Sequence, residues 1–357
     1  MARVPRPRSR RHRRPRRPPR RLRRPQRPRP HRLAHRRLDL HRHGPLTPRG
    51  AVVPERVSEP RVAVVVRTKD RPLFLRRALG SIAAQTLVDW QCVIVNDGGD
   101  PSAVDAAIEA LDEAHRGKVR AIHHEQPRGR WVSANAGVLA TTAPLLVLHD
   151  DDDTWHPDFL ARAVAYLDRL PERVGVVSRI EIRWEELRDG TYETVSRETF
   201  QPDLPVPTLA DTLLFNRFVP IGFVYRRALH AEFGLYDERL PVIGDWNFNL
   251  RVLAKHPLDY LDDAVPYAYW HQRVGDTGDA GNSVIAARGD HAKYDALIRD
   301  EELRRHVEEH GLGLVLYLTK FIDRRFVEVE NGIRGELRQT SPLSSRLVPR
   351  LRRLLRR

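Results

Sequence analysis

Apolar runs of strand length alternate with segments of helical periodicity between residues 61 and 150. The predicted strands, which are rich in Val, Ile, Leu and Ala, are residues 61–66, 90–96, 119–122 and 145–148. The predicted helices, which carry apolar residues three and four positions apart, are residues 72–83 and 102–115, and residues 129–140 are predicted to be a loop that leads into a further helix. Strands and helices that alternate in this way form a mostly parallel, doubly wound sheet with polar loops after its strands. The sequence therefore predicts an α/β fold.

Beyond residue 150 the same patterns predict a less regular order of elements. The predicted helices are residues 157–170, 208–214, 226–233 and a helix that opens at Gly244-Asp245. The predicted strands are residues 174–178, 180–182, 220–225 and 266–271, with a turn at 189–190. Residues 284–336 are predicted to be mainly helical.

The predicted strand 145–148 runs directly into four consecutive aspartates, Asp150 to Asp153. In open α/β sheets, ligands bind outside the carboxyl ends of the strands, where this acidic run lies. Adjacent carboxylates repel one another unless a cation lies among them, and their hard oxygen atoms suit Mg²⁺ or Mn²⁺. The alternative is a solvated acidic turn that caps the next helix.

The net charge of +15 is unevenly distributed along the 357 residues. Residues 1–60 hold 21 Arg and three acidic residues, and residues 338–357 hold seven Arg and no acidic residue, which leaves 61–337 with a net charge of −10. With almost nothing to bury, residues 1–60 are expected to be disordered. They are read as a segment that binds nucleic acid or anionic lipid, as a solvated extension without a role, or as untranslated sequence.

The single cysteine and the lengths of the apolar stretches bear on the cellular location that we expect for the protein. The one cysteine, Cys92, lies in a predicted strand, so we expect a buried structural thiol. No apolar stretch reaches the roughly 18 residues of a membrane helix, and no apolar segment follows the Arg-rich start as in a signal peptide. We expect a cytoplasmic protein, with peripheral contact to the inner face of the cell membrane through its basic ends.

Five segments together resemble family 2 of the glycosyltransferases. These segments are Val64–Arg71, Val95–Gly99, Asn135–Gly137, Asp150–Asp153 and Gly244–Arg251. Each is weak alone, but they occur in the order and spacing of that family. The resemblance implies a GT-A fold and a domain organisation of a tail over 1–60, a GT-A domain over 61–275, a helical extension over 276–340 and a basic tail over 341–357.

The resemblance also implies a binding site for a nucleotide-diphosphate sugar linked to UDP, dTDP or GDP. The residues that it places there are Thr68, Arg71, Asp97, Arg128, Asn135, Asp150 and Asp151. Asp97 would hydrogen-bond the base, unless it is only a turn former. The family often has an Arg where this chain has Ala134, and Arg128 or Arg130 is the expected replacement on the diphosphate.

By the same resemblance, Asp150, Asp152 and His271 would hold Mg²⁺ or Mn²⁺, and Asp245 would be the catalytic base. A structural N-cap is the alternative for Asp245, and a satisfied, half-buried ring is the alternative for His271. The chain has Gly244 where the family usually has Glu before the catalytic Asp. It also lacks the Q-x-x-R-W motif of processive synthases, which favours transfer of a single sugar.

The expected function is therefore metal-dependent, inverting transfer of one sugar to a hydroxyl of a glycan, a lipid-linked or a small-molecule acceptor, in glycan, cell-surface polysaccharide or glycoconjugate synthesis. Three alternatives compete with it. A nucleotidyltransferase would need a Gly-rich loop where the chain has Arg67 to Arg71. The others are a catalytically inactive sugar-nucleotide-binding relative and a nucleic-acid-binding protein that acts through its Arg tail; nucleic acid is the less favoured partner.

Overall fold

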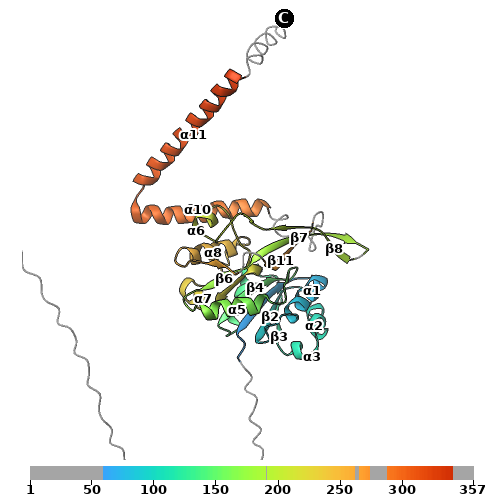
Figure 1. Cartoon of the computed structure of the whole chain (residues 1–357). Helices are drawn as coiled ribbons and strands as arrows, with labels where there is room; N and C mark the ends of the chain where they lie inside the picture. Colours follow the sequence, from blue (N-terminus) through green and yellow to red (C-terminus); the bar gives the residue numbers. More distant parts are fainter. Residues whose placement is uncertain (1–58, 190, 262–264, 274–287, 341–357) are drawn as a thin grey trace, which may run out of the picture. The chain divides into compact units, whose positions relative to one another are not determined.

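The structure, a computed structural model, describes residues 59–189, 191–261, 265–273 and 288–340 (Figure 1). Contacts group Val57–Arg357 into one compact unit. The predicted basic tail 341–357, nearly all of the predicted tail 1–60 and one residue of the predicted turn at 189–190 lie outside the described residues. The predicted domain boundaries at 60, 275 and 340 stay predictions.

A seven-stranded sheet forms the centre, in the order β10-β6-β9-β4-β1-β2-β3. The bounds of its strands are β1 Val62–Thr68, β2 Trp90–Asp97, β3 Val119–His124, β4 Leu145–Asp150, β6 Gly175–Val177, β9 Phe223–Arg226 and β10 Asp259–Tyr260. Only β9 runs antiparallel to its neighbours β4 and β6. The mostly parallel sheet confirms the predicted fold class, and all four strands predicted before residue 150 are present.

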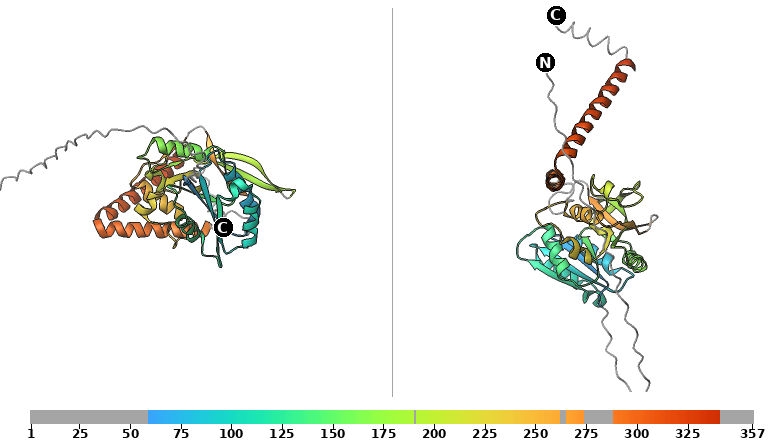
Figure 2. Two further views of the ribbon diagram at one scale, coloured as in Figure 1. Left: turned by 90° about the horizontal axis from the view of Figure 1, so that it is seen from below. Right: turned by 90° about the vertical axis from the view of Figure 1, so that its left-hand side faces the viewer.

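Helices cover both faces of this sheet, as both views in Figure 2 show. The helices up to residue 169 are α1 Pro72–Ala83, α2 Pro101–Glu109, α3 Glu113–Arg116, α4 Arg130–Leu139 and α5 Phe159–Arg169. After β1 the chain adds β2 and β3 on one side and then returns to add β4 on the other side of β1. Because connections between parallel strands are right-handed, this reversal places α4 on the opposite face of the sheet from α1 and α2. The single helix predicted over 102–115 was wrong, because Asp112 caps a separate short helix through the His115 amide.

A second sheet of four strands lies beyond the acidic run, in the order β5-β11-β7-β8. Its strands are β5 Thr154–Trp155, β7 Arg179–Arg188, β8 Thr191–Thr199 and β11 Pro266–Arg273. The sequence prediction missed β8 and cut β7 short at 182, because β8 is polar and almost wholly exposed and β7 is mainly polar beyond that point. Parallel pairing of β11 with β7 sets His271 opposite Arg183 and Arg273 opposite Glu185.

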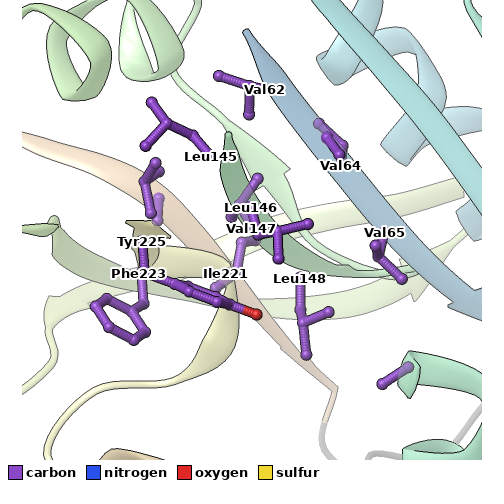
Figure 3. Packing of buried hydrophobic residues seen from close by; sticks show 14 of the residues in the cluster. Val62, Val64, Val65, Leu145, Leu146, Val147, Leu148, Ile221, Phe223 and Tyr225 are labelled. Atoms are coloured by element: carbon purple, nitrogen blue, oxygen red, sulfur yellow. The ribbon is translucent and has the colours of Figure 1, made fainter. Parts of the chain in front are cut away.

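The core is formed by side chains of β1 and β4 and of the elements that pack on these two strands, as Figure 3 shows. Every residue of β1 is buried, as the continuous apolar run predicts for a central parallel strand. Cys92 in β2 is fully buried, which confirms the predicted structural thiol, and burial raises the pKa of that thiol well above its ordinary value. The close-up labels core side chains of three strands and the turn before β9: Val62, Val64, Val65, Leu145, Leu146, Val147, Leu148, Ile221, Phe223 and Tyr225.

The later helices include two long ones at the end of the described chain. The short elements are α6 Leu209–Thr212, η1 Pro220–Gly222, α7 Ala228–Phe233 and α8 Gly244–Leu253, and the long ones are α10 Arg288–His310 and α11 Gly313–Thr340. The helix α10 contacts the rest through buried Ile298 and through Arg299, which donates to the Leu214 carbonyl at 2.9 Å. Among the described helices, none is both long and apolar enough to cross a membrane.

Candidate active site

The carboxyl ends of β1 and β4 meet at one edge of the central sheet. Their parallel register pairs Arg67 with Asp150, so the loop after β1 and the acidic run after β4 leave the sheet side by side. Thr68, the last residue of β1, donates its hydroxyl hydrogen to Asp151 Oδ2 at 2.7 Å. The two sequence segments that the family resemblance selected are therefore in direct contact.

Three arginines pair with the first three aspartates of the run. Arg67 forms an ion pair with Asp150. Arg71 lies 3.1 Å from Asp151 Oδ1 and 3.2 Å from Asp152 Oδ2. Charge-assisted pairing of this kind offsets part of the repulsion among the adjacent carboxylates.

A third arginine reaches the run from the second sheet. Arg273, at the end of β11, is 1% exposed and donates to Asp152 Oδ2 at 2.5 Å. Its neighbour Arg77 of α1 donates to the Asp152 carbonyl at 2.6 Å and to Glu185 Oε1 at 2.6 Å. The acidic run is therefore held by cations from α1, β1, β11 and the loop after β1.

These partners give adjacent carboxyl groups different acidities. Burial raises the pKa of Asp150, but Arg67 and Arg130 outweigh burial and hold that pKa below its ordinary value. Burial and the neighbouring Asp152 raise the pKa of Asp151 to about 7. Of these two carboxyl groups, Asp150 is therefore the one that is held as an anion. Its side chain is still 37% exposed and so open to a ligand.

Asp97, the predicted base-binding carboxylate, lies at the end of β2 in a cradle of donors. Its oxygens accept from the Arg128 amide at 2.8 Å and the Gly129 amide at 2.9 Å, and His124 Nδ1 lies 3.1 Å away. Burial raises its pKa, but these donors together lower it, so the group is an ionised acceptor. The turn depends on Gly98, whose φ is +77° and whose added Cβ would lie 2.4 Å from the Pro127 nitrogen.

Asn135 and the two candidate arginines lie on or near α4. The buried Asn135 amide donates to the Tyr236 carbonyl and to Glu238 Oε1, both at 2.9 Å, and accepts from the Tyr236 amide at 3.0 Å. A donor contact from Asn135 would have to replace one of these bonds. Arg128 is exposed, whereas the Arg130 guanidinium is half-buried, and its pKa is lowered by burial and by Arg67 and raised by Asp150 and Asp245. Of the two, Arg130 is the one electrostatically joined to the aspartates.

Asp245 lies in the first turn of α8, far along the chain from the acidic run, yet Arg67 and Asp150 both act on its carboxyl group. Asn216 Nδ2 donates to Asp245 Oδ2 at 2.7 Å, and Asn249 Nδ2 donates to Asn216 Oδ1 at 3.0 Å. Burial raises the pKa of Asp245, Asp150 raises it further, and Arg67 and Arg130 oppose the rise. Asp150 and Asp245 therefore lie within electrostatic reach of the same two arginines.

The backbone before Asp245 is shaped by a close approach of α4 to α8. Ile243 has φ +55°, which is costly for a β-branched residue, at about 1–3 kcal/mol. A Cβ on Gly244 would lie 2.7 Å from the indole of buried Trp131, so the Glu that the family usually carries there has no room. Trp131 in turn lies beneath the Arg67 guanidinium, with 4.9 Å from the guanidinium carbon to the ring centroid. The chain thus has Gly244 in place of the family's usual Glu at a position where the Trp131 ring fills the space of a side chain.

His271 has a partner at each ring nitrogen. Its Nδ1 lies 2.6 Å from Glu185 Oε1, and its Nε2 lies 2.7 Å from Thr154 Oγ1. Burial lowers the pKa of His271, so the neutral ring donates through Nδ1 and accepts the Thr154 hydroxyl hydrogen at Nε2. A carboxylate behind Nδ1 is the arrangement that orients a metal-binding histidine, and Nε2 would ligate a metal only if Thr154 turned away. His271 as a metal ligand stays a prediction.

The carboxylates of the site meet part of what a hard divalent cation needs from its ligands. Among the described residues, no group of three or more His, Cys, Asp and Glu side chains is arranged to hold a metal ion. Mg²⁺ and its relatives are commonly held by only one or two protein carboxylates, with substrate phosphates completing the shell. Asp150 and Asp152 offer such a pair, after their arginine partners shift.

The sequence interpretation missed several residues that build this site. Arg67 left a signal, because it is a charge within the buried run of β1. Arg273 follows His271 by two positions and so shares its face of the strand. Glu185 and Asn216 carried no signal, since only the pairing of β7 with β11 and the fold around α8 bring them to the site.

Comparisons with known proteins identify the family. The model of "Glycosyl transferase family 2" matches residues 63–233. The chain is 31% identical over 254 residues to "Uncharacterized glycosyltransferase YwdF" of Bacillus subtilis, covering 71% of this chain and 85% of that protein. The chain belongs to family 2 of the glycosyltransferases. This confirms the resemblance and the predicted GT-A fold.

Other similarities to this glycosyltransferase are weaker. It is 28% identical over 205 residues to "PGL/p-HBAD biosynthesis glycosyltransferase" of Mycobacterium bovis, which covers 57% of this chain and 73% of that protein. Among solved structures, S. aureus TarS 1-349 in complex with UDP-GlcNAc has a TM-score of 0.49 at 18% identity, over 71% of this chain and 75% of that chain. PcManGT from Pyrobaculum calidifontis, in complex with GDP-Man and Mn²⁺, has a TM-score of 0.46 at 18% identity, over 62% of this chain and 59% of that chain. TM-scores below 0.5 support no conclusion about substrate.

Proposed function

We propose that this family 2 glycosyltransferase moves one sugar from a nucleotide-diphosphate sugar to an acceptor hydroxyl, with inversion at the anomeric carbon. The observation that carries the proposal is that Asp150 and Asp245 both act on the buried Arg67 guanidinium and on the half-buried Arg130 guanidinium. One carboxylate is held anionic at the edge of the sheet, and the other lies at the start of α8 with a raised pKa. Two carboxylates with divergent acidities suit two different roles.

On the donor side, Asp97 and Thr68 would contact the nucleoside and Arg71 and Arg130 the diphosphate. The leaving group gains negative charge as the bond to the sugar breaks, and nearby guanidiniums stabilise that charge. Asp150 and Asp152 would hold Mg²⁺ or Mn²⁺, which supplies further positive charge to the phosphate oxygens. His271 would join this set through Nε2, and Asn135 and Arg128 would line the donor pocket.

On the acceptor side, Asp245 would take the proton of the attacking hydroxyl. The hydroxyl oxygen forms the new bond to the anomeric carbon, the bond to the diphosphate oxygen breaks, and the proton goes to Asp245. A base with a raised pKa suits this work, because proton transfer is efficient when the pKa of the base is near the working pH. Asn216 would orient the carboxylate through its 2.7 Å hydrogen bond. One step with one base inverts the configuration.

The acceptor class and the setting are part of the proposal. A lipid-linked glycan, a cell-surface polysaccharide or a small metabolite would present the hydroxyl, and the basic segments 1–60 and 341–357 would bring the cytoplasmic enzyme to the anionic inner face of the membrane. The absence of the Q-x-x-R-W motif from the sequence supports transfer of a single sugar.

A donor screen tests the proposal. The full chain is incubated with UDP-, dTDP- and GDP-sugars and with acceptors of the proposed classes, with and without Mn²⁺, and release of the nucleoside diphosphate is measured. Proton NMR then gives the anomeric configuration of any product. We expect Mn²⁺-stimulated release from one donor class and an inverted product. Tight donor binding without turnover for every acceptor would favour the inactive relative, and a retained configuration would exclude Asp245 as the base of a direct displacement.

A further inference from the structure

The helix α11 exposes an unusual amount of apolar surface. Large apolar side chains between Leu314 and Ile333 are each 42–71% exposed. Exposed single hydrophobic residues are ordinary, but a contiguous set on one helix marks an interaction surface. Figure 1 shows α11 as one continuous helix, and its 28 residues correspond to a length of about 42 Å.

Most of these side chains share one side of α11. At about 100° per residue, they fall within an arc of about 140°. The apolar face of α11, as we call this set, consists of Leu318, Phe321, Ile322, Phe326, Val329 and Ile333. An apolar stripe of this width needs cover from another apolar phase to be stable in water.

Six charged residues of α11 form three ion pairs along the helix. Lys320 pairs with Asp323 at 2.8 Å, and Arg334 pairs with Glu330 at 2.5 Å. Two charges, Arg325 and Glu336, lie inside the apolar arc, and Glu336 comes after Ile333, the last residue of the apolar face. Arg325 pairs with Glu328 at 2.8 Å and has a long apolar stem that can run along an apolar phase. An amphipathic helix of this kind suits a position in the plane of a lipid–water interface.

The residues at and after the end of α11 indicate what the apolar face of α11 binds. Residues 338–357 contain seven Arg, no acidic residue and Leu between the arginines. Anionic headgroups complement that charge. Two copies of α11 packed side by side in parallel would instead bring two such positive segments together, and the arc is wider than the narrow seam of a two-stranded coiled coil.

We propose that the apolar face of α11 docks onto an anionic phospholipid surface, with the arginines of 338–357 on the headgroups. The inference takes from the proposed function only the peripheral association with a membrane. It adds the surface of the protein that makes this contact. It does not depend on the donor, the base or the sugar. Docking of this kind holds the enzyme where an acceptor with a lipid anchor presents its hydroxyl.

A matched pair of double variants tests the proposal on the full chain. Ile322→Glu with Val329→Glu places two charges on the apolar face of α11. Leu316→Glu with Val327→Glu makes the same chemical change and the same net-charge change on the other side, since Val327 lies roughly 200° around the helix from Val329. Partitioning is measured by sedimentation with vesicles of phosphatidylcholine alone and of equal parts phosphatidylcholine and phosphatidylglycerol, and the oligomeric state is measured by light scattering.

We expect the unaltered chain to bind the mixed vesicles at least tenfold more strongly than the neutral ones. We expect the apolar-face variant to lose at least tenfold in partitioning to the mixed vesicles, and the control to stay within about threefold of the unaltered chain. Equal losses in both variants would reduce the effect to charge alone and overturn the proposal. A dimer that only the apolar-face variant dissociates, with vesicle binding unchanged, would make a second copy the occupant and overturn it too.

Nucleoside diphosphate release without vesicles separates this test from the proposed function. Neither double variant touches the site around Asp150 and Asp245, so both should release the product at the rate of the unaltered chain. Failure of release in all three chains, with the expected vesicle binding, would contradict the proposed function and leave the docking surface standing.

Discussion

Asp150 and Asp245 are two carboxyl groups under the influence of the same arginines, yet their acidities move in opposite directions. Asp150 ends β4 and pairs directly with Arg67, and its pKa falls below the ordinary value despite burial. Asp245 opens α8 with Asn216 as its side-chain hydrogen-bond donor, and burial raises its pKa. At Asp150 the arginines outweigh burial and hold the carboxyl group as an anion, whereas at Asp245 burial and the negative Asp150 outweigh the same arginines and leave a group that can exchange a proton.

The difference extends to how the two sides of the site are built. The sheet edge is dense with charge, since every aspartate from 150 to 152 has an arginine partner. The α8 side is built from amides, an indole and a glycine. The first suits a diphosphate and a cation, and the second suits a neutral hydroxyl whose proton must leave. Four substitutions would break or sharpen this contrast.

Among these four, the largest effect is expected from Asp152→Asn on the charged side. Loss of one anionic oxygen should weaken donor binding at least about tenfold and remove its response to Mn²⁺. Isothermal titration with the donor, with and without Mn²⁺, measures both. Asp153→Asn is the control: burial raises the pKa of Asp153 well above its ordinary value, and an amide oxygen can still accept the His271 amide hydrogen. Equal losses in both variants would remove the special role of Asp152.

Arg67→Met should affect both sides at once. Without this buried cation, the pKa of Asp150 and the pKa of Asp245 both rise, and the free energy of unfolding falls by about 1–3 kcal/mol. Urea unfolding measures the change. Arg61→Met is the matched control, because the Arg61–Asp168 pair is exposed and its loss should cost at most about 1 kcal/mol. An unfolding free energy unaltered by Arg67→Met would contradict the linking role of Arg67.

Gly244→Ala tests the close approach on the α8 side. The added methyl would lie 2.7 Å from the Trp131 indole, so the buried ring must move, at a cost of about 1–3 kcal/mol in unfolding free energy and with a fall in turnover as Asp245 shifts. Gly80→Ala provides the comparison, since its added methyl meets nothing within 4 Å and should stabilise α1 by about 0.5–1 kcal/mol. A harmless Gly244→Ala would show that Trp131 does not fix α8.

Asn216→Ala should give the smallest effect, a shift in pH dependence. Asp245 acts as a base only when ionised, so activity is lost as the pH falls through its pKa. Removing the Asn216 donor destabilises the carboxylate and raises that pKa, so activity should be lost at a higher pH than in the unaltered chain. The pH profile of kcat/KM measures the shift, with Asn247→Ala as the control on the same helix. A shift to lower pH would contradict the arrangement.

Much of the charged side could be predicted from sequence, and much of the α8 side could not. The run from Leu145 into Asp150 states both the strand and its acidic end, and parallel pairing then places Thr68 beside it. Asn216 reaches Asp245 only through the packing of distant loops, and the pairing of Arg273 with Asp152 depends on the second sheet. Trp131 gave a helical, apolar pattern like any core residue, so its contact with Gly244 had no local sign.

The most direct test of the account is a comparison of donor binding and turnover in Asp245→Asn. The account predicts that the donor dissociation constant stays within about threefold of the unaltered value, while kcat falls by about 100- to 10 000-fold, the usual contribution of a general base. A variant that turns over at the unaltered rate, or one that loses donor affinity as much as turnover, would contradict the division of work between the edge of the sheet and α8.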